Sequence, residues 1–318
     1  MRSAALIAVL LVALAASPVV PRTASVSAPS LTPGDTWTYR TNTSLGAGFY
    51  LDGHVTLTVV EHGNISVEGA AYNAYRMSVS GTGTAAGNFS TDFGTTPASG
   101  SWVLTGQEVF ESAGLKTIMT VLDLEANGTL HTSPVQLPFR LSVQNTTTYR
   151  IVEDGWRFPH AVGDSAVVRL ALNFTEDFRL FYGLPTTPVH TAGIVWSNVT
   201  YTLETETTVD TPAGTFDSFR ISSSYPDGTR DRAYYAPAAG SDVRRESYTG
   251  NDTSPVSTTE LVTYRYQALE PARFFGLTTS DWIIVVALIA VASVPVIVLF
   301  RWQTRSKPPP GPPPPPNR

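Results

Sequence analysis

Apolar and polar residues alternate through most of residues 30–272, and no long amphipathic helix pattern interrupts them. The stretch Val55-Thr56-Leu57-Thr58-Val59 alternates strictly and is followed by a turn signal at His62-Gly63-Asn64. Pro226-Asp227-Gly228 lies between two more alternating stretches and predicts a hairpin. Further strands are expected over residues 216–223, 230–236 and 259–266. The pattern predicts an all-β fold of antiparallel, curved sheets joined by short turns.

Three segments depart from simple alternation. Residues 81–100 contain five glycines among Thr, Ser and Ala, which predicts a flexible loop. Arg244-Arg245-Glu246 puts three charges in a row, which is typical of an exposed strand edge where charge discourages pairing with another sheet. Lys307 is followed by eight prolines interrupted by Gly311, which predicts a stiff polyproline II segment.

The two ends of the chain carry apolar runs of different length. Ala4–Ala16 is a run of 13 residues behind Arg2, and small residues follow it, which is typical of a secretory signal peptide. Residues 282–300 hold 19 positions without a charge, which is enough for one transmembrane helix. We therefore expect a cleaved leader at one end and a membrane anchor at the other.

Charge gives the orientation of this anchor. Residues 30–272 carry 25 acidic and 14 basic side chains, a balance of −11, whereas residues 301–318 carry four basic side chains and no acidic one. Basic flanks remain on the cytoplasmic side, so we expect a single-pass protein of the cell membrane with its large N-terminal part outside. An acidic outer part also repels phosphate backbones, which argues against a nucleic-acid partner.

A faint internal repeat divides the outer part. Gly34-Asp35-Thr36 recurs as Gly163-Asp164-Ser165, and residues 55–79 align with residues 199–223 at an offset of 144 without a gap. Five of these 25 positions are identical, and we favour duplication over coincidence. The expected organisation is a signal peptide (1–28), two related β repeats or half-barrels (29–158 and 159–272), a juxtamembrane segment (273–281), a transmembrane helix (282–300) and a proline-rich cytoplasmic tail (301–318).

The second repeat carries a resemblance to a known family. Its stretches Gly163-Asp164, Val209–Arg220, Tyr234-Tyr235-Ala236-Pro237 and Val243–Glu246 resemble a pattern of bacterial and archaeal envelope proteins of the DUF3108 kind. Those proteins are broadly similar to the lipoprotein-carrier (LolA-like) half-barrels. The resemblance implies a curved antiparallel sheet with an apolar concave face, and it implies no catalytic residue.

Asparagine usage supports an extracellular location. Eight of the ten asparagines stand in Asn-x-Ser/Thr sequons, whereas the 69 Ser and Thr residues among 318 would give about two by chance. We expect glycans on several of these asparagines. The sequons are at Asn42, Asn64, Asn88, Asn127, Asn145, Asn173, Asn198 and Asn251.

Residues 169–196 make the second repeat 15 positions longer than the first. Large apolar side chains in this insertion form our candidate binding patch, because an exposed cluster of that size marks an interaction site. The alternative is a loop that folds back over the sheet as a lid on the core. The candidate patch is Phe174, Phe178, Leu180, Phe181, Tyr182 and Leu184.

Cysteine is absent, the five histidines are scattered, and no nucleophile, phosphate-loop or metal motif occurs. We therefore expect no enzyme activity, no metal and no cofactor. The composition favours a structural or interaction glycoprotein of an archaeal cell envelope, with the bilayer and an envelope protein, glycan or apolar ligand as partners. The alternative, which the resemblance favours, is a carrier or binder of a lipid or another apolar ligand in a concave sheet.

The orientation is testable on intact cells. Added protease should digest the outer part and leave a small membrane-protected fragment that contains Arg301–Arg318, because the basic flank holds this end in the cytoplasm. Mass spectrometry of the membrane fraction identifies the fragment. Loss of the tail with survival of the large part would reverse the orientation.

Overall fold

The computed structural model describes residues 24–44, 48–91, 94–132, 135–182, 188–250 and 252–267. Most of the signal peptide, and the predicted juxtamembrane segment, transmembrane helix and tail, lie outside these residues. Within the described part the chain forms strands, turns and loops without a helix, so no helix there could span a bilayer.

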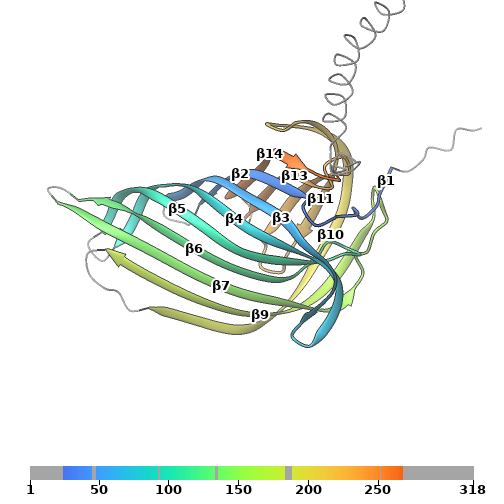
Figure 1. Cartoon of the computed structure of the whole chain (residues 1–318), viewed down its shortest axis with the longest axis horizontal. Helices are drawn as coiled ribbons and strands as arrows, with labels where there is room; N and C mark the ends of the chain where they lie inside the picture. Colours follow the sequence, from blue (N-terminus) through green and yellow to red (C-terminus); the bar gives the residue numbers. More distant parts are fainter. Residues whose placement is uncertain are drawn as a thin grey trace, which may run out of the picture. The chain divides into compact units, whose positions relative to one another are not determined.

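The strands in chain order are β1 (Ser25–Val26), β2 (Thr36–Ser44), β3 (Phe49–Val67), β4 (Ala70–Thr91), β5 (Gly94–Glu111), β6 (Thr117–His131), β7 (Gln136–Asp154), β8 (His160–Ala161), β9 (Ser165–Tyr182), β10 (Val189–Thr211), β11 (Gly214–Ser224), β12 (Arg230–Ala236), β13 (Ser241–Tyr248) and β14 (Ser257–Arg265). Twelve of them close into one antiparallel barrel, in which β14 pairs back with β2 (Figure 1). Strands β1 and β8 form a separate two-stranded sheet. The predicted all-β antiparallel fold is confirmed, and its strands close into a single barrel.

The barrel wall is uneven because its strands differ in length. Strands β3–β7, β9 and β10 have 15–23 residues, whereas β2 and β11–β14 have 7–11. The long strands extend as a broad curved sheet past the short ones (Figure 1). One result is that β10 pairs with β11 only from Thr200 onward, although it pairs with β9 from Val189.

Apolar side chains pack in three large clusters, each of which contains a buried tryptophan. Trp37 of β2 centres the first, Trp102 of β5 the second, and Trp156 of the loop between β7 and β8 the third. A smaller cluster packs the tip of the β3–β4 hairpin against β5 and β6, through Ile65, Val67, Ala74, Val109 and Ile118. We call the three large clusters the Trp37, Trp102 and Trp156 clusters. They occupy much of the interior.

The two Gly-Asp pairs of the sequence repeat have the same hydrogen bonds. Gly34 N–H donates to the carbonyl of Val59 at 2.8 Å, and the Val59 N–H donates to the Asp35 carbonyl at 2.9 Å. Gly163, Leu203 and Asp164 repeat this pair of bonds at 2.8 and 2.9 Å. Both glycines have positive φ, +96° and +98°, which favours glycine at these positions.

Irregularities of the strands also recur in matching places. The β3–β4 and β10–β11 pairs each shift register once, at residues 60 and 204, and the offset of 144 is the one seen in the sequence. The β5–β6 pair shifts at residue 118 and the β12–β13 pair at residue 243. Two register shifts among β3–β6 are thus matched by two among β10–β13.

Two expectations for local structure were wrong. Residues 81–100 are not a flexible loop, because residues 81–91 belong to β4 and residues 94–100 to β5, and these two strands pair. Here glycine lets β4 approach the indole of Trp102: a Cβ on Gly83 would lie 2.7 Å from its Nε1. The turn expected at His62-Gly63-Asn64 is also absent, since β3 continues to Val67 and turns at Glu68-Gly69.

Lys116, between β5 and β6, is buried among charged and polar partners. Its Nζ lies 2.9 Å from Asp154 Oδ1 and 3.3 Å from Glu111 Oε2, and it donates to the Trp156 carbonyl at 2.6 Å. The Trp156 ring in turn stacks on His160 with ring centroids 3.7 Å apart. The ammonium group thus anchors the loop that inserts Trp156 into its cluster.

Replacement of Lys116 by Met should reduce the free energy of unfolding by about 3 kcal/mol, because the partly buried Glu111 loses its cation and Asp154 keeps only the exposed Arg157. Denaturant unfolding followed by tryptophan fluorescence measures the loss. Arg140→Met is the control: its ion pair with Glu125 is exposed, so the loss should stay below about 1 kcal/mol. Equal losses in the two variants would show that Lys116 does not anchor the loop.

Candidate functional site

The candidate patch does not form one surface. It lies in β9, which pairs with β7 on one side and β10 on the other, so this segment is part of the barrel wall rather than a lid. Strand alternation turns four of the six side chains inward and Phe181 outward, where it is 41% exposed. Leu184 lies outside the described residues. The inward residues are Phe174, Phe178, Leu180 and Tyr182.

The expectation of an exposed edge at Arg244-Arg245-Glu246 was also wrong. Strand β13 pairs with both β12 and β14, so it has no free edge there. Arg244 faces outward and forms an ion pair with Glu260. Arg245 lies on the opposite face of β13. Its cross-strand partner is Thr259, whose partner on the other side is the buried Thr41. Thr41 shares the inner face of β2 with Trp37 and Tyr39, so Arg245 is also on the inner face.

Arg245 therefore points into the barrel, and the residue is more than a third exposed. Charge interactions link its guanidinium to titratable groups of β2, β5, β7, β10, β12 and β13. Among the described residues no carboxylate lies within 4.0 Å of its guanidinium. We call the surrounding region the polar chamber, and it is formed by Glu108, Tyr149, Tyr201, Tyr225, Asp231, Asp242 and Arg245.

The electrostatics of the polar chamber favour a permanently charged arginine beside weakened acids. Burial alone lowers the pKa of Arg245, but the charges of Asp242 and Asp231 outweigh it and the pKa is raised. Burial raises the pKa of Glu108 and of Asp242, and Arg245 offsets this only in part. Both acids thus take up a proton more readily than in water.

Tyrosine hydroxyls supply further hydrogen-bonding groups. Burial raises the pKa of Tyr201 to about 12, and burial followed by the nearby Asp231 charge raises that of Tyr225. These phenols keep their protons near neutral pH and can donate. Tyr225 donates its hydroxyl to Asp231 Oδ2 at 3.2 Å.

Apolar side chains line the interior next to this chamber. They come from the inner faces of β5, β6, β7 and β9, and they are only partly buried although they pack against the Trp102 and Trp156 clusters. The interior thus has a polar region around Arg245, to which β5, β7 and β10 also contribute, and an apolar region on the inner faces of β5, β6, β7 and β9. The apolar lining includes Leu104, Leu124, Val143, Leu172, Phe178 and Leu180.

The sequons fall on different faces. Six of the eight asparagines are exposed: Asn42, Asn64, Asn88, Asn127, Asn173 and Asn198. Asn145 shares the inner face of β7 with Val143 and Thr147, and its Oδ1 accepts from the Thr147 hydroxyl at 3.0 Å. Asn251 lies outside the described residues. Period-two alternation alone could have separated Asn145 from the others.

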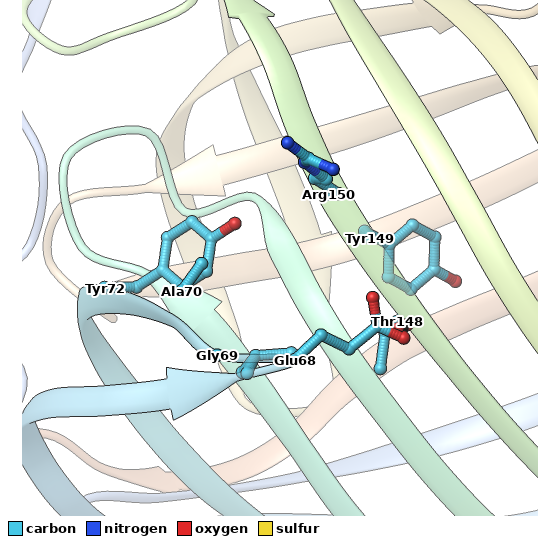
Figure 2. A pocket seen from close by; sticks show the side chains of 8 residues that line it. Glu68, Gly69, Ala70, Tyr72, Thr148, Tyr149 and Arg150 are labelled. Atoms are coloured by element: carbon cyan, nitrogen blue, oxygen red, sulfur yellow. Dashed lines mark hydrogen bonds between the residues drawn. The ribbon is translucent and has the colours of Figure 1, made fainter.

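A cavity of about 300 Å³ lies between the β3–β4 hairpin tip and β7. Figure 2 shows Glu68 reaching from the tip toward Thr148, with Tyr72 and Arg150 beside the cavity. The Glu68 carboxylate accepts from Thr148 Oγ1 at 2.6 Å and from Asn173 Nδ2 at 2.8 Å, and these bonds lower its pKa. Both bonds reach Glu68 Oε1 and hold the hairpin tip against β7 and β9, so we take the polar chamber as the better candidate.

Residues with metal-ligating side chains do not converge: no group of three or more such residues occurs within the described ranges. The charge of Asp231 contributes to the raised pKa of Asp242, whereas Asp227 lies in the β11–β12 turn and accepts from the Thr229 N–H. Comparisons with protein-family models, curated proteins and solved structures give no match to this chain.

The raised pKa of Glu108 gives a testable dependence on pH. The folded barrel binds the proton of Glu108 more tightly than the unfolded chain does, so protonation of Glu108 stabilises the fold. This stabilisation is complete below the ordinary glutamate pKa of about 4.3. It is lost as the pH rises through the raised value. Glu108→Gln should therefore melt at a higher temperature than the wild type at pH 7, with the difference vanishing near pH 4.

Thermal melts between pH 4 and pH 8 measure this difference. Glu125→Gln is the matched control, since Glu125 is on the outer face of β6 in an exposed pair with Arg140. A Glu108→Gln profile that runs parallel to the wild type at every pH would contradict the assignment.

Proposed function

We propose that the barrel binds an amphiphilic molecule, with the polar head in the polar chamber and the apolar part along the inner faces of β5–β7 and β9. The unpaired guanidinium of Arg245 inside the barrel is the observation that carries this proposal. Asp242 and Asp231 stabilise its charge from beyond ion-pair distance, so the N–H donors of the guanidinium have no carboxylate in direct contact. A ligand oxyanion supplies the missing partner.

The size of the barrel supports a bound ligand. Eight strands enclose an interior just wide enough for side chains or one small ligand, and sixteen leave a water channel. Twelve strands give an interior between these limits. A purely structural envelope role, which the composition favours, needs neither this space nor a free arginine in it.

The chamber also restricts the head group. A guanidinium matches carboxylate or phosphate oxygens in a two-bond geometry, and the phenols of Tyr149 and Tyr201 can add donors. Three carboxyl groups nearby, from Glu108, Asp231 and Asp242, disfavour a head with several negative charges. A head with one negative charge, such as a fatty-acid carboxylate, is the best match.

The two halves of the barrel are, in this proposal, related repeats with boundaries at residues 29–158 and 159–272. The shared Gly-Asp hydrogen bonds and the register shifts at residues 60 and 204 support it. Such halves agree with the expected resemblance to envelope carriers. The proposal keeps the protein outside the cell, anchored through residues 282–300.

A photoreactive fatty acid, a palmitate analogue bearing a diazirine in its chain, tests the proposal on the full-length protein. Cells that express the protein are labelled and irradiated, and the attachment sites are found by peptide mass spectrometry. We expect labels on inner residues such as Phe178 and Leu124. Labels confined to residues 282–300 would indicate contact with the bilayer alone and would contradict interior binding.

Arg245→Met should reduce interior labelling at least tenfold, because a hydrogen bond to a charged group contributes about 1.5–3 kcal/mol. Arg244→Met is the matched control, since the neighbouring arginine pairs with Glu260 on the outside. Protease resistance of both variants shows that the barrel is folded. Equal labelling of the two variants would remove Arg245 from the site.

A further inference from the structure

Strand β10 has a free edge on the described barrel. Residues 189–199 pair with β9 on one side, but the partner strand β11 begins its pairing only at Thr200. Unpaired N–H and C=O groups at such an edge are a template for pairing with another chain. Protection of this edge is therefore a requirement for a barrel that stays monomeric.

The usual protection is missing from the sequence of this edge. Edge strands commonly carry lysine, other charges or proline that oppose pairing. Between Val189 and Val199 the only ionisable side chain is His190, which already binds Asp177 across the β9–β10 pair at 3.0 Å. The remaining residues include apolar ones that would favour association.

The outer face of the edge is strongly apolar. Ile194 is 67% exposed and Trp196 is 60% exposed, and they lie on the same face two residues apart. Arg169 of β9 packs on this face, with its guanidinium 5.4 Å from the centre of the Trp196 ring. Together Ile194 and Trp196 form what we call the edge patch.

Two sequon asparagines flank the edge patch on this same face. Asn173 of β9 is the cross-strand partner of Ile194, a position at which Cβ atoms are about 5 Å apart. Asn198 follows Trp196 by two residues on β10, about 7 Å along the strand. Both asparagines are exposed. A sugar linked to either one starts beside the patch.

We propose that glycans on Asn173 and Asn198 lie over Ile194 and Trp196 and block the free edge of β10 against pairing with a second copy of this chain. The C–H faces of sugar rings pack against the electron-rich face of an indole. The bulk of the glycan then hinders an approaching strand, as a charged side chain does at other edges. This role is independent of ligand binding in the polar chamber.

The contact between Asn173 and Glu68 is compatible with this modification. Asn173 Nδ2 donates to Glu68 Oε1 at 2.8 Å. The amide nitrogen has two hydrogens, and linkage to a sugar replaces only one of them. The other remains available, so the β3–β4 hairpin tip can keep Glu68 near a glycosylated Asn173.

Substitution of the sequon threonines removes the glycans and leaves both asparagines in place. Thr175→Val with Thr200→Val removes both sequons, whereas Thr175→Ser with Thr200→Ser retains them and serves as the matched control. Full-length protein from the native host, in detergent, is analysed by glycopeptide mass spectrometry and by light scattering after size exclusion. We expect glycans and monomers in the wild type and in the serine variant.

The valine variant should form dimers or larger species as its concentration rises, and hydroxyl-radical footprinting should oxidise Trp196 several-fold faster. Adding Ile194→Lys should restore the monomer, which distinguishes edge pairing from misfolding. Bare Asn173 and Asn198 in the wild type would overturn the proposal. So would a valine variant that stays monomeric, or one that the lysine does not rescue. Labelling of the interior by the fatty acid should be the same in the valine variant and in the wild type.

Discussion

Closure of the hydrogen-bond ladder between β14 and β2 is the constraint on which the rest of this structure depends. Once the ladder is closed, each strand residue faces either the interior or the outside, and a shift of one position exchanges the two. Strands β6 and β13 each contain one extra residue, at positions 118 and 243, which shifts the alternation of the residues that follow. Through this rule Arg245 faces inward while Arg244 beside it meets Glu260 outside.

Sequence patterns predicted the strands well and their closure poorly. The alternation around Pro226-Asp227-Gly228 correctly gave β11 and β12, because a hairpin depends on local turn chemistry. The loop predicted over residues 81–100 was wrong, since Trp102 of β5 packs against Gly81 and Gly83 of β4 and no local pattern shows that contact. Arg245 was missed because three adjacent charges look exposed unless both strand partners are known. The split of the candidate patch by alternation was predictable from period two alone.

Strands β2–β7 and strands β9–β14 have different interior residues, although their register shifts occur at matching positions. Counted from the register shifts at residues 118 and 243, the position in β6 that matches Arg245 is Thr120. Glu108 of β5 likewise matches Ala233 of β12. The backbone irregularities are shared, but the charges of the polar chamber are not. If the halves arose by duplication, their chemistry diverged while their backbone geometry was retained.

The burial of Lys116 has a consequence for how this protein is observed. The chain contains two lysines, Lys116 and Lys307, and the first has its amine enclosed between Glu111, Asp154 and the Trp156 carbonyl. No other lysine occurs in residues 24–267, so the folded barrel presents no lysine amine to solvent. Amine-directed biotin reagents and lysine cross-linkers, the common tools for cataloguing proteins on cell surfaces, have no lysine to react with on this barrel.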